Sequence, residues 1–285
     1  MKQIFGTLAL SALAACSGNV SLNGTGTGGD SGNSGDTTVA VNEVFLESDS
    51  DQLTLNAVDY NEKTSELKLT NLPFDAADDT YTLISGAALS NGFAAYESNP
   101  ATSDAEMHYF AVFRRSDSGN SQVVAAGTNG FRDTGFAGAA TQRFSADVTL
   151  PNDGNYVYSG EYAGVRITTS EDSNTVAQFV TGDTRIVLDF DDAGTGTAVG
   201  AIYNRDTYDS AGVSDGGTLP NLSLVLTSID HENASLKQGS VNISGGADNA
   251  GTWDALFAGP NGEELAGIVL LTEDNSRETG GFIID

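Results

Sequence analysis

From residue 41 onward, short apolar or alternating runs of the chain are separated by clusters of Gly, Asn, Asp, Ser and Pro. Alternation with a period of two is typical of β-strands, and the separating residues favour tight turns. We find no run with the 3.6-residue apolar period of an amphipathic helix. The pattern therefore predicts strands at 43–46, 52–59, 66–70, 81–84, 91–97, 106–115, 121–127, 156–163, 176–180, 184–190, 197–203, 222–230, 239–243, 250–257, 264–271 and 279–284.

The predicted strands of the second half follow one another through short connections, such as 191–194 and 245–249. Successive strands with short turns can close into an up-and-down barrel, which removes exposed sheet edges. We therefore predict an all-β fold with a strand-rich N-terminal subdomain at 41–150. It is followed by an antiparallel up-and-down barrel of about eight strands at 151–285, beginning at the turn Pro151-Asn152-Asp153-Gly154.

Acidic residues interrupt several of the predicted barrel strands, at Glu161, Asp183, Asp189 and Asp254. A barrel that crosses a membrane needs strands of about ten residues with a continuous outward apolar band. We expect instead a filled, water-soluble barrel, with aromatic side chains inside and a solvated outside.

The charge balance of the 285-residue chain is strongly acidic, with 12 Lys and Arg against 39 Asp and Glu and a formal net charge of −27. This charge repels phosphate backbones and argues against nucleic acid as a partner. It also favours solubility in saline surroundings. The single cysteine excludes an intramolecular disulfide, and with two histidines the chain has too few ligands for a zinc site of the Cys/His kind.

Residues 1–15 have the pattern of a secretory signal, with Lys2 followed by an apolar run too short to span a bilayer. The run ends in Leu13-Ala14-Ala15-Cys16, which resembles the bacterial lipobox in front of a cysteine that is lipidated. We therefore predict a signal peptide at 1–15, acyl chains including palmitate on Cys16 and a flexible linker at 16–40. By resemblance to lipoprotein sorting in Gram-negative bacteria, Ser17 permits export, so we expect a lipid-anchored protein of the outer membrane exposed at the cell surface.

Three stretches are more specific than composition: Tyr158-Ser159-Gly160-Glu161-Tyr162-Ala163-Gly164, then Asp189-Phe190 with 199–205, then 257–267. Together they resemble the C-terminal β-barrel module of transferrin-binding-protein-B-like surface lipoproteins, over residues 156–285. A segment at 126–136 resembles a Gly/aromatic segment of small alphaproteobacterial members, whereas the ending 280–285 departs from the usual one. The motif positions that match are Tyr158, Gly160, Tyr162, Gly164, Asp189, Phe190, Asn204, Arg205, Gly259, Pro260, Glu263, Glu264 and Gly267.

The same residues have a structural interpretation. Glycine within or beside a strand permits close approach of two backbones, and large aromatic side chains can fill a barrel. Arg205 with Glu263 and Glu264 is a candidate for a salt bridge that closes the barrel. The aromatic residues expected inside are Tyr158, Tyr162, Phe190, Tyr203, Trp253 and Phe257.

Few residues are available for catalysis or metal binding. No strand followed by a helix is predicted anywhere in the chain, so it has no Gly-x-Ser-x-Gly nucleophile elbow, and we expect His108 to be a strand residue and His231 a loop residue. The acidic run that starts at Asp189 is not an EF-hand, because Gly200 stands where the motif needs Glu. We therefore expect no enzymatic activity, no cofactor and no metal.

Three functions remain open at this point. The resemblance implies a lipid-anchored binding module whose exposed loops contact a macromolecule or capture a nutrient, with an iron-related ligand implied by the larger family members. The alternatives are a lipocalin-like carrier or envelope enzyme that uses the barrel interior, and a purely structural envelope protein. An interior filled by aromatic side chains favours binding at the surface, whereas a wide cavity with convergent polar groups favours the carrier.

Overall fold

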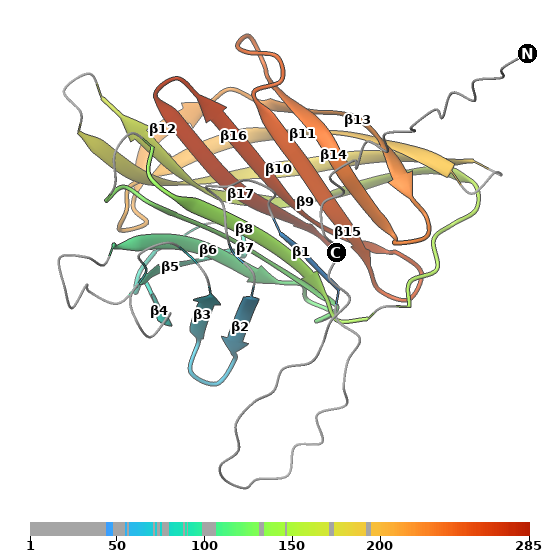
Figure 1. Cartoon of the computed structure of the whole chain (residues 1–285), viewed down its shortest axis with the longest axis horizontal. Helices are drawn as coiled ribbons and strands as arrows, with labels where there is room; N and C mark the ends of the chain where they lie inside the picture. The colour runs from blue at the N-terminus through green and yellow to red at the C-terminus, as the bar shows by residue number, and fades with distance from the viewer. Residues whose placement is uncertain are drawn as a thin grey trace, which may run out of the picture.

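The computed structural model describes residues 44–47, 55, 57–70, 72, 75, 80–87, 89, 91–98, 107–130, 134–145, 147–170, 174–191 and 195–285. These ranges contain two antiparallel sheets and no helix (Figure 1), so the predicted all-β class is confirmed. Accordingly, no helix in the described ranges has the length and apolar character to cross a membrane. The predicted signal peptide, Cys16 and the linker at 16–40 lie outside the described residues.

The first sheet is an open, eight-stranded sheet in the order β1-β8-β7-β6-β5-β4-β3-β2. From β2 to β8 each strand pairs with the next one along the chain, and β1 joins at the far side of β8. The strands are β1 Val44–Glu47, β2 Ala57–Asn61, β3 Glu66–Thr70, β4 Thr80–Leu83, β5 Ala94–Ser98, β6 Tyr109–Arg115, β7 Ser121–Thr128 and β8 Ala137–Arg143.

The second sheet closes into the predicted eight-stranded barrel. Its order is β10-β9-β17-β16-β15-β14-β13-β11-β12, and β10 also pairs with β11, so every strand except β12 belongs to the closed ring. β12 extends the wall beside the C-terminal end of β11. The strands are β9 Gly154–Thr169, β10 Thr175–Asp191, β11 Thr195–Tyr208, β12 Ser214–Leu219, β13 Leu222–Asp230, β14 Ser235–Ile243, β15 Gly251–Ala258, β16 Glu264–Glu273 and β17 Ser276–Ile284.

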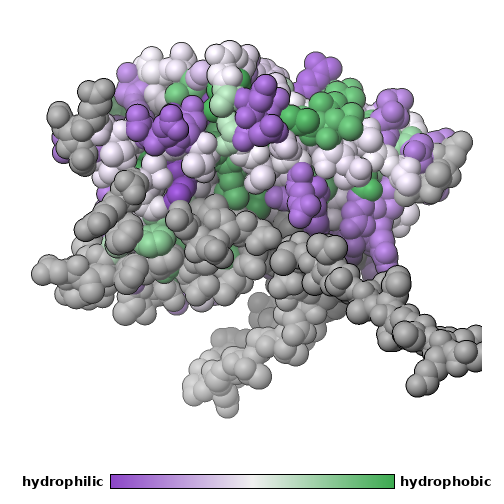
Figure 2. All heavy atoms as spheres, turned by 45° about the horizontal axis from the view of Figure 1, so that its top comes forward, coloured by the Kyte–Doolittle hydropathy of each residue, from purple (hydrophilic) through white to green (hydrophobic). Residues whose placement is uncertain are grey.

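One face of the first sheet packs against the outside of the barrel, and the contact has an apolar core. Phe110, Val112 and Val123 of the first sheet meet Val165 and Ile268 of the barrel there. The barrel wall along β9, β16 and β17 is therefore covered on both faces, by its own interior and by the first sheet. Elsewhere the outer surface is a mixture of polar and apolar patches, as the face in Figure 2 shows.

The other face of the first sheet has an apolar cluster of its own. Leu55, Leu67 and Leu72 lie over buried side chains that include Tyr96 and Phe113. β6 thus alternates strictly between two apolar environments, which explains why the run from Tyr109 to Phe113 is buried at every position.

The strand prediction differs from the structure at a few places. The predicted strands 176–180 and 184–190 are one continuous strand, β10, and the structure has two strands that were not predicted, β8 and β12. Small side chains explain β8: its sequence Ala-Gly-Ala-Ala-Thr-Gln-Arg lacks a large apolar residue, yet every position is buried between neighbouring layers. β8 ends at Arg143 and β9 begins at Gly154, so residues 151–153 of the predicted boundary turn lie between the two strands and its last residue begins β9.

Candidate functional site

The barrel interior is filled, and at one end the filling is aromatic. Phe190 lies at its centre, with its ring edge-on to Tyr156 at 5.6 Å and to His231 at 5.4 Å between ring centroids. Phe257 packs against the same ring at 6.1 Å. Such ring pairs at 4.5–7 Å are favourable arrangements, so these side chains close this end of the barrel.

Farther along the axis, the interior holds Trp253 and Phe282, both fully buried, with ring centroids 6.5 Å apart. The indole N–H of Trp253 donates to the backbone carbonyl of Val225 at 3.2 Å. Glycine makes room for the two rings, because a Cβ on Gly239 would overlap the indole and one on Gly267 would overlap the Phe282 ring. The predicted aromatic filling is therefore present, with Tyr203 the exception: it points outward and is half-buried.

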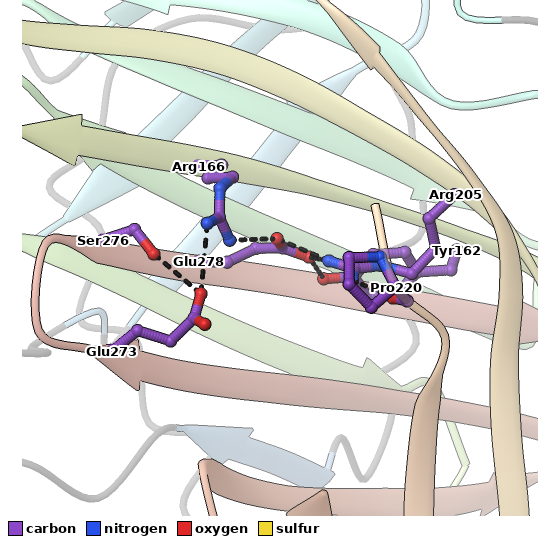
Figure 3. A network of polar contacts seen from close by, with 7 residues as sticks. All are labelled: Tyr162, Arg166, Arg205, Pro220, Glu273, Ser276 and Glu278. Atoms are coloured by element: carbon purple, nitrogen blue, oxygen red, sulfur yellow. Dashed lines mark hydrogen bonds and ion pairs between the residues drawn. The ribbon is translucent and has the colours of Figure 1, made fainter. Parts of the chain in front are cut away.

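At the other end the interior is charged (Figure 3). Glu278 of β17 is fully buried and accepts hydrogen bonds from Arg205 Nη2 at 2.5 and 2.6 Å and from the Tyr162 hydroxyl at 2.7 Å. Arg166 Nη1 approaches the same carboxylate at 3.4 Å. Arg166 also pairs with Glu273 at 3.1 Å, nearer the rim. We call Tyr162, Arg166, Arg205 and Glu278 the ionic network.

Electrostatics keeps the ionic network in its charged form. Burial alone raises the pKa of Glu278, but Arg205 and Arg166, together with the Tyr162 hydroxyl, outweigh burial and hold that pKa below its ordinary value. Burial and the nearby Glu278 carboxylate raise the pKa of Tyr162 well above its usual value, so the hydroxyl stays protonated and donates. Both oxygens of Glu278 are engaged by groups of the chain itself, which leaves this carboxylate unavailable as a metal ligand.

A β-bulge on β11 aims Arg205 into the barrel. The register between β10 and β11 shifts at this point, because Asp183 faces Tyr203 whereas Thr181 faces Asp206, so Asn204 and Arg205 together oppose a single residue. Asn204 has φ of 51°, a left-handed conformation that Asn tolerates better than other non-glycine residues. Its side chain donates to Asp183 at 2.6 Å. The motif Asn204-Arg205 therefore describes a bulge and the buried cation that it positions.

The predicted salt bridge between Arg205 and Glu263 or Glu264 was wrong, since Arg205 pairs with Glu278. Glu264 instead turns away from the barrel axis and binds the β6–β7 turn, accepting from Asn120 Nδ2 at 3.1 Å and Ser121 Oγ at 3.1 Å. Glu264 is thus a buried link between the two sheets.

Glu263 has a local role in the β15–β16 turn, where its carboxylate accepts from the backbone N–H of Asn261 at 2.7 Å. The carboxylate lies over Gly259, whose φ of +78° and whose lack of a Cβ both suit the tight turn before Pro260. This turn contacts the first barrel strand, because the Tyr158 hydroxyl donates to the carbonyl of Gly262 at 3.0 Å.

The remaining motif glycines bring backbones or rings together. A Cβ on Gly160 would lie 2.7 Å from the Ile284 Cα, and one on Gly164 would lie 2.9 Å from the Tyr162 hydroxyl. Asp189 is the exception among the motif residues, since its side chain is exposed on the outer wall. The structure therefore gives almost every motif residue a part in building the barrel.

The two histidines lie outside the ionic network, His108 beside the first sheet and His231 at the aromatic end of the barrel. His108 precedes β6 instead of lying in a strand, and its Nε2 is 3.2 Å from the exposed Glu97 carboxylate. His231 lies in the turn after β13, as expected, with its ring against Phe190. Among the described residues, no three His, Cys, Asp or Glu side chains come together as metal ligands.

Sequence reasoning missed Glu278 and Arg166, the acid and one of the bases of the ionic network. Arg277-Glu278 and Arg166 stand in strand patterns where a charge ordinarily marks the solvent face. The signal that distinguishes them is on the alternate positions, Val165 and Ile167, which are apolar and face the first sheet.

No protein-family model matches the chain, and no curated protein matches it. Solved structures similar to it include transferrin-binding protein B of Haemophilus parasuis Hp5, with TM-score 0.43 and 14% identity over 85% of this chain and 50% of that chain. Another is the N-lobe of lactoferrin-binding protein B of Moraxella bovis, with TM-score 0.31 and 12% identity over 86% of this chain and 99% of that domain. A third is a surface lipoprotein, with TM-score 0.36 and 10% identity over 61% of this chain and 80% of that one. The chain spans about half the length of the first of these proteins.

Proposed function

We propose that this protein is a lipid-anchored binding module of the bacterial outer membrane that meets a partner with its outer surface, while the barrel interior serves as a scaffold and performs no catalysis. The observation that carries the proposal is the filled interior. Trp253, Phe257 and Phe282 are fully buried along the axis, and the charges at one end bind each other. A lipocalin-like carrier needs an open cavity in that place.

The lipid anchor in this proposal rests on the sequence alone, in which Leu13-Ala14-Ala15-Cys16 contains the single cysteine of the chain. Replacing Cys16 by Ala should abolish palmitate labelling of the protein in producing cells and release it from the membrane fraction. Unchanged labelling would refute the anchor. Ser17→Ala is the matched control, because it alters the neighbouring residue and keeps the thiol.

The scaffold role of the interior can be tested with the fluorescence of Trp253, the single tryptophan of the chain. Oleate and benzene, added to the purified full chain, should give no saturable change in emission. Phe282→Ala is the positive control: it removes the ring beside Trp253, and apolar cavities of that kind bind benzene. One-to-one, saturable quenching of the wild-type chain by either probe would show a ligand cavity and overturn the proposal.

A further inference from the structure

The outer wall of the barrel carries an apolar row on the side that the first sheet leaves uncovered. Val187 of β10 lies opposite Val157 of β9 on one side and Val199 of β11 on the other. Val225 and Leu226 of β13 lie beside Val199. Val157, Val199 and Leu226 are exposed to 53%, 40% and 61%. We call Val157, Val187, Val199 and Leu226 the valine row.

Leu226 reaches the surface through a β-bulge. Ala198 pairs with Thr227 and Gly200 pairs with Leu224, so two residues of β13 stand against one of β11. A second irregularity adjoins it on β14, where Gln238 has φ of 59° and its backbone N–H donates to Asp254 at 2.7 Å. Bulges re-aim side chains and are over-represented next to functional sites. Here the bulge places a leucine in water at the end of an apolar row.

The two polar rows that adjoin the valine row carry one charge each, Asp189 on one side and Arg185 on the other, and the next row beyond Arg185 is acidic. Asp189 lies in the row nearer the aromatic end of the barrel, between Asn155 and Thr197. On the other side, Arg185 is followed by Asp183, which stands directly opposite Glu161. Burial and then the Asp183 charge raise the pKa of Glu161, which Arg114 partly offsets. Two carboxylates opposed across strands are unfavourable, and a cation from outside would relieve them.

Shape and charge together restrict what can cover this row. It crosses four neighbouring strands of a closed barrel, so it follows the circumference and is convex. Two copies of the chain would bring convex surfaces and like charges together, and a flat anionic membrane would touch only part of the row. A concave, cationic surface fits both properties.

We propose that the valine row is the docking surface for a partner protein whose contact face is concave, apolar at its centre and positively charged at its edges. This inference rests on the proposed function, because it specifies which part of the outer surface binds. Val187 and Val199 form the centre of the contact. Asp189, Asp183 and Glu161 pair with the cations at its edges.

Photo-crosslinking on cells that produce the full chain tests the proposal. The photoreactive residue p-benzoylphenylalanine replaces Val199, or replaces Val213 in the control, a valine exposed to 59% outside the row. We expect a protein adduct at position 199 and none at 213, with the attached partner retained on a cation exchanger. Val157→Asp with Leu226→Asp should reduce the adduct at least tenfold, whereas Leu83→Asp, on the first sheet, should leave it within twofold.

A thermal unfolding transition of the purified Val157→Asp/Leu226→Asp variant that resembles the wild-type transition excludes misfolding as the cause of the lost adduct. If this variant fails to fold, the variant Val157→Thr/Leu226→Thr is used in its place. The proposal is overturned by no adduct at 199, equal adducts at both positions, an adduct with the mass of two copies, an adduct to lipid, or an acidic partner. An adduct at 213 alone would leave the proposed function standing and refute the valine row. Uptake of oleate into the interior would refute the proposed function itself.

Discussion

The two halves of the barrel have opposite patterns of apolar and charged side chains. In the half beneath the first sheet, Val165 and Ile167 of β9 point outward into an apolar contact, while Arg166 between them points inward to Glu278. In the uncovered half, Ile186 and Leu188 of β10 fill the interior, and the outward positions Arg185 and Asp189 on either side of them carry exposed charges. We call these the covered half and the open half.

The comparison teaches that burial in a barrel depends on what lies on both sides of the wall. Where a second layer covers the outside, apolar residues can face outward, and the interior can hold charged side chains that pair with one another. Where water meets the outside, the interior has to supply the apolar contacts. The valine row departs from this pattern, since it is apolar on the open half, and the departure is what marks it as a docking surface.

The largest effect is expected from breaking the charged interior of the covered half. Glu278→Gln leaves Arg205 buried without its anion, and removing one partner of a buried pair costs about 3–5 kcal/mol. Urea unfolding of the variant should show a loss of this size. Glu273→Gln is the control, because that carboxylate is partly exposed at the rim and should cost about 1 kcal/mol or less. Equal losses in the two variants would contradict the distinction between interior and rim.

The ionisation of Glu278 should also make the stability of the chain depend on pH. The pKa of Glu278 is lower in the folded chain than the value of about 4.3 for a Glu in the unfolded chain. The contribution of Glu278 to the free energy of unfolding is therefore fully present above about pH 4.3 and is lost as the pH falls through the folded pKa. The difference in unfolding free energy between wild type and Glu278→Gln should therefore narrow from pH 7 to pH 3. A difference that stays constant over this range would show that the pKa of Glu278 is the same in the folded and the unfolded chain.

A matched pair of substitutions on β9 compares the two outer walls directly. Val165→Thr places a hydroxyl in the contact with the first sheet, where the valine is 1% exposed, and should cost about 1–3 kcal/mol. Val157→Thr makes the same change where the valine is 53% exposed, and should change stability by about 0.5 kcal/mol or less. Unfolding midpoints of the two variants measure the difference, and similar midpoints would show that the first sheet does not cover this wall in solution.

The sequence predicted the strands of the barrel well because most of them alternate with large apolar residues at the buried positions. It failed at β8, where the chain is buried on both faces and small residues replace the large ones. It also divided β10 at Thr181-Gly182-Asp183, a polar stretch that reads as a turn. In the structure Gly182 lies opposite the bulge at Asn204 and Arg205, so the glycine serves close packing within one strand.

The ionic network could be predicted only in part, for a related reason. The motif Asn204-Arg205 marked one member, but its partner was sought among the acids of another matching motif, Glu263 and Glu264. The true partner, Glu278, is an acid in a strand, and such a residue faces solvent unless a second layer covers the opposite face. Which face is covered depends on contacts between distant segments, such as Val123 with the outer wall, and local periodicity does not contain that information.

The smallest effect concerns Asn204, which lies where β11 passes from the open to the covered half. Ile202 points inward before it and Arg205 points inward after it, so the bulge shifts the alternation by one residue. Asn204→Val puts a β-branched residue at φ of 51° and should cost about 1–2 kcal/mol, whereas Asn204→Gly should be close to neutral.

If the alternation depends on this bulge, the valine variant should also weaken the Arg205–Glu278 pair. Glu278→Gln would then cost less in Asn204→Val than in the wild-type chain. A double-mutant cycle measured by urea unfolding gives that coupling, and strictly additive losses would show that Arg205 reaches the interior without the bulge.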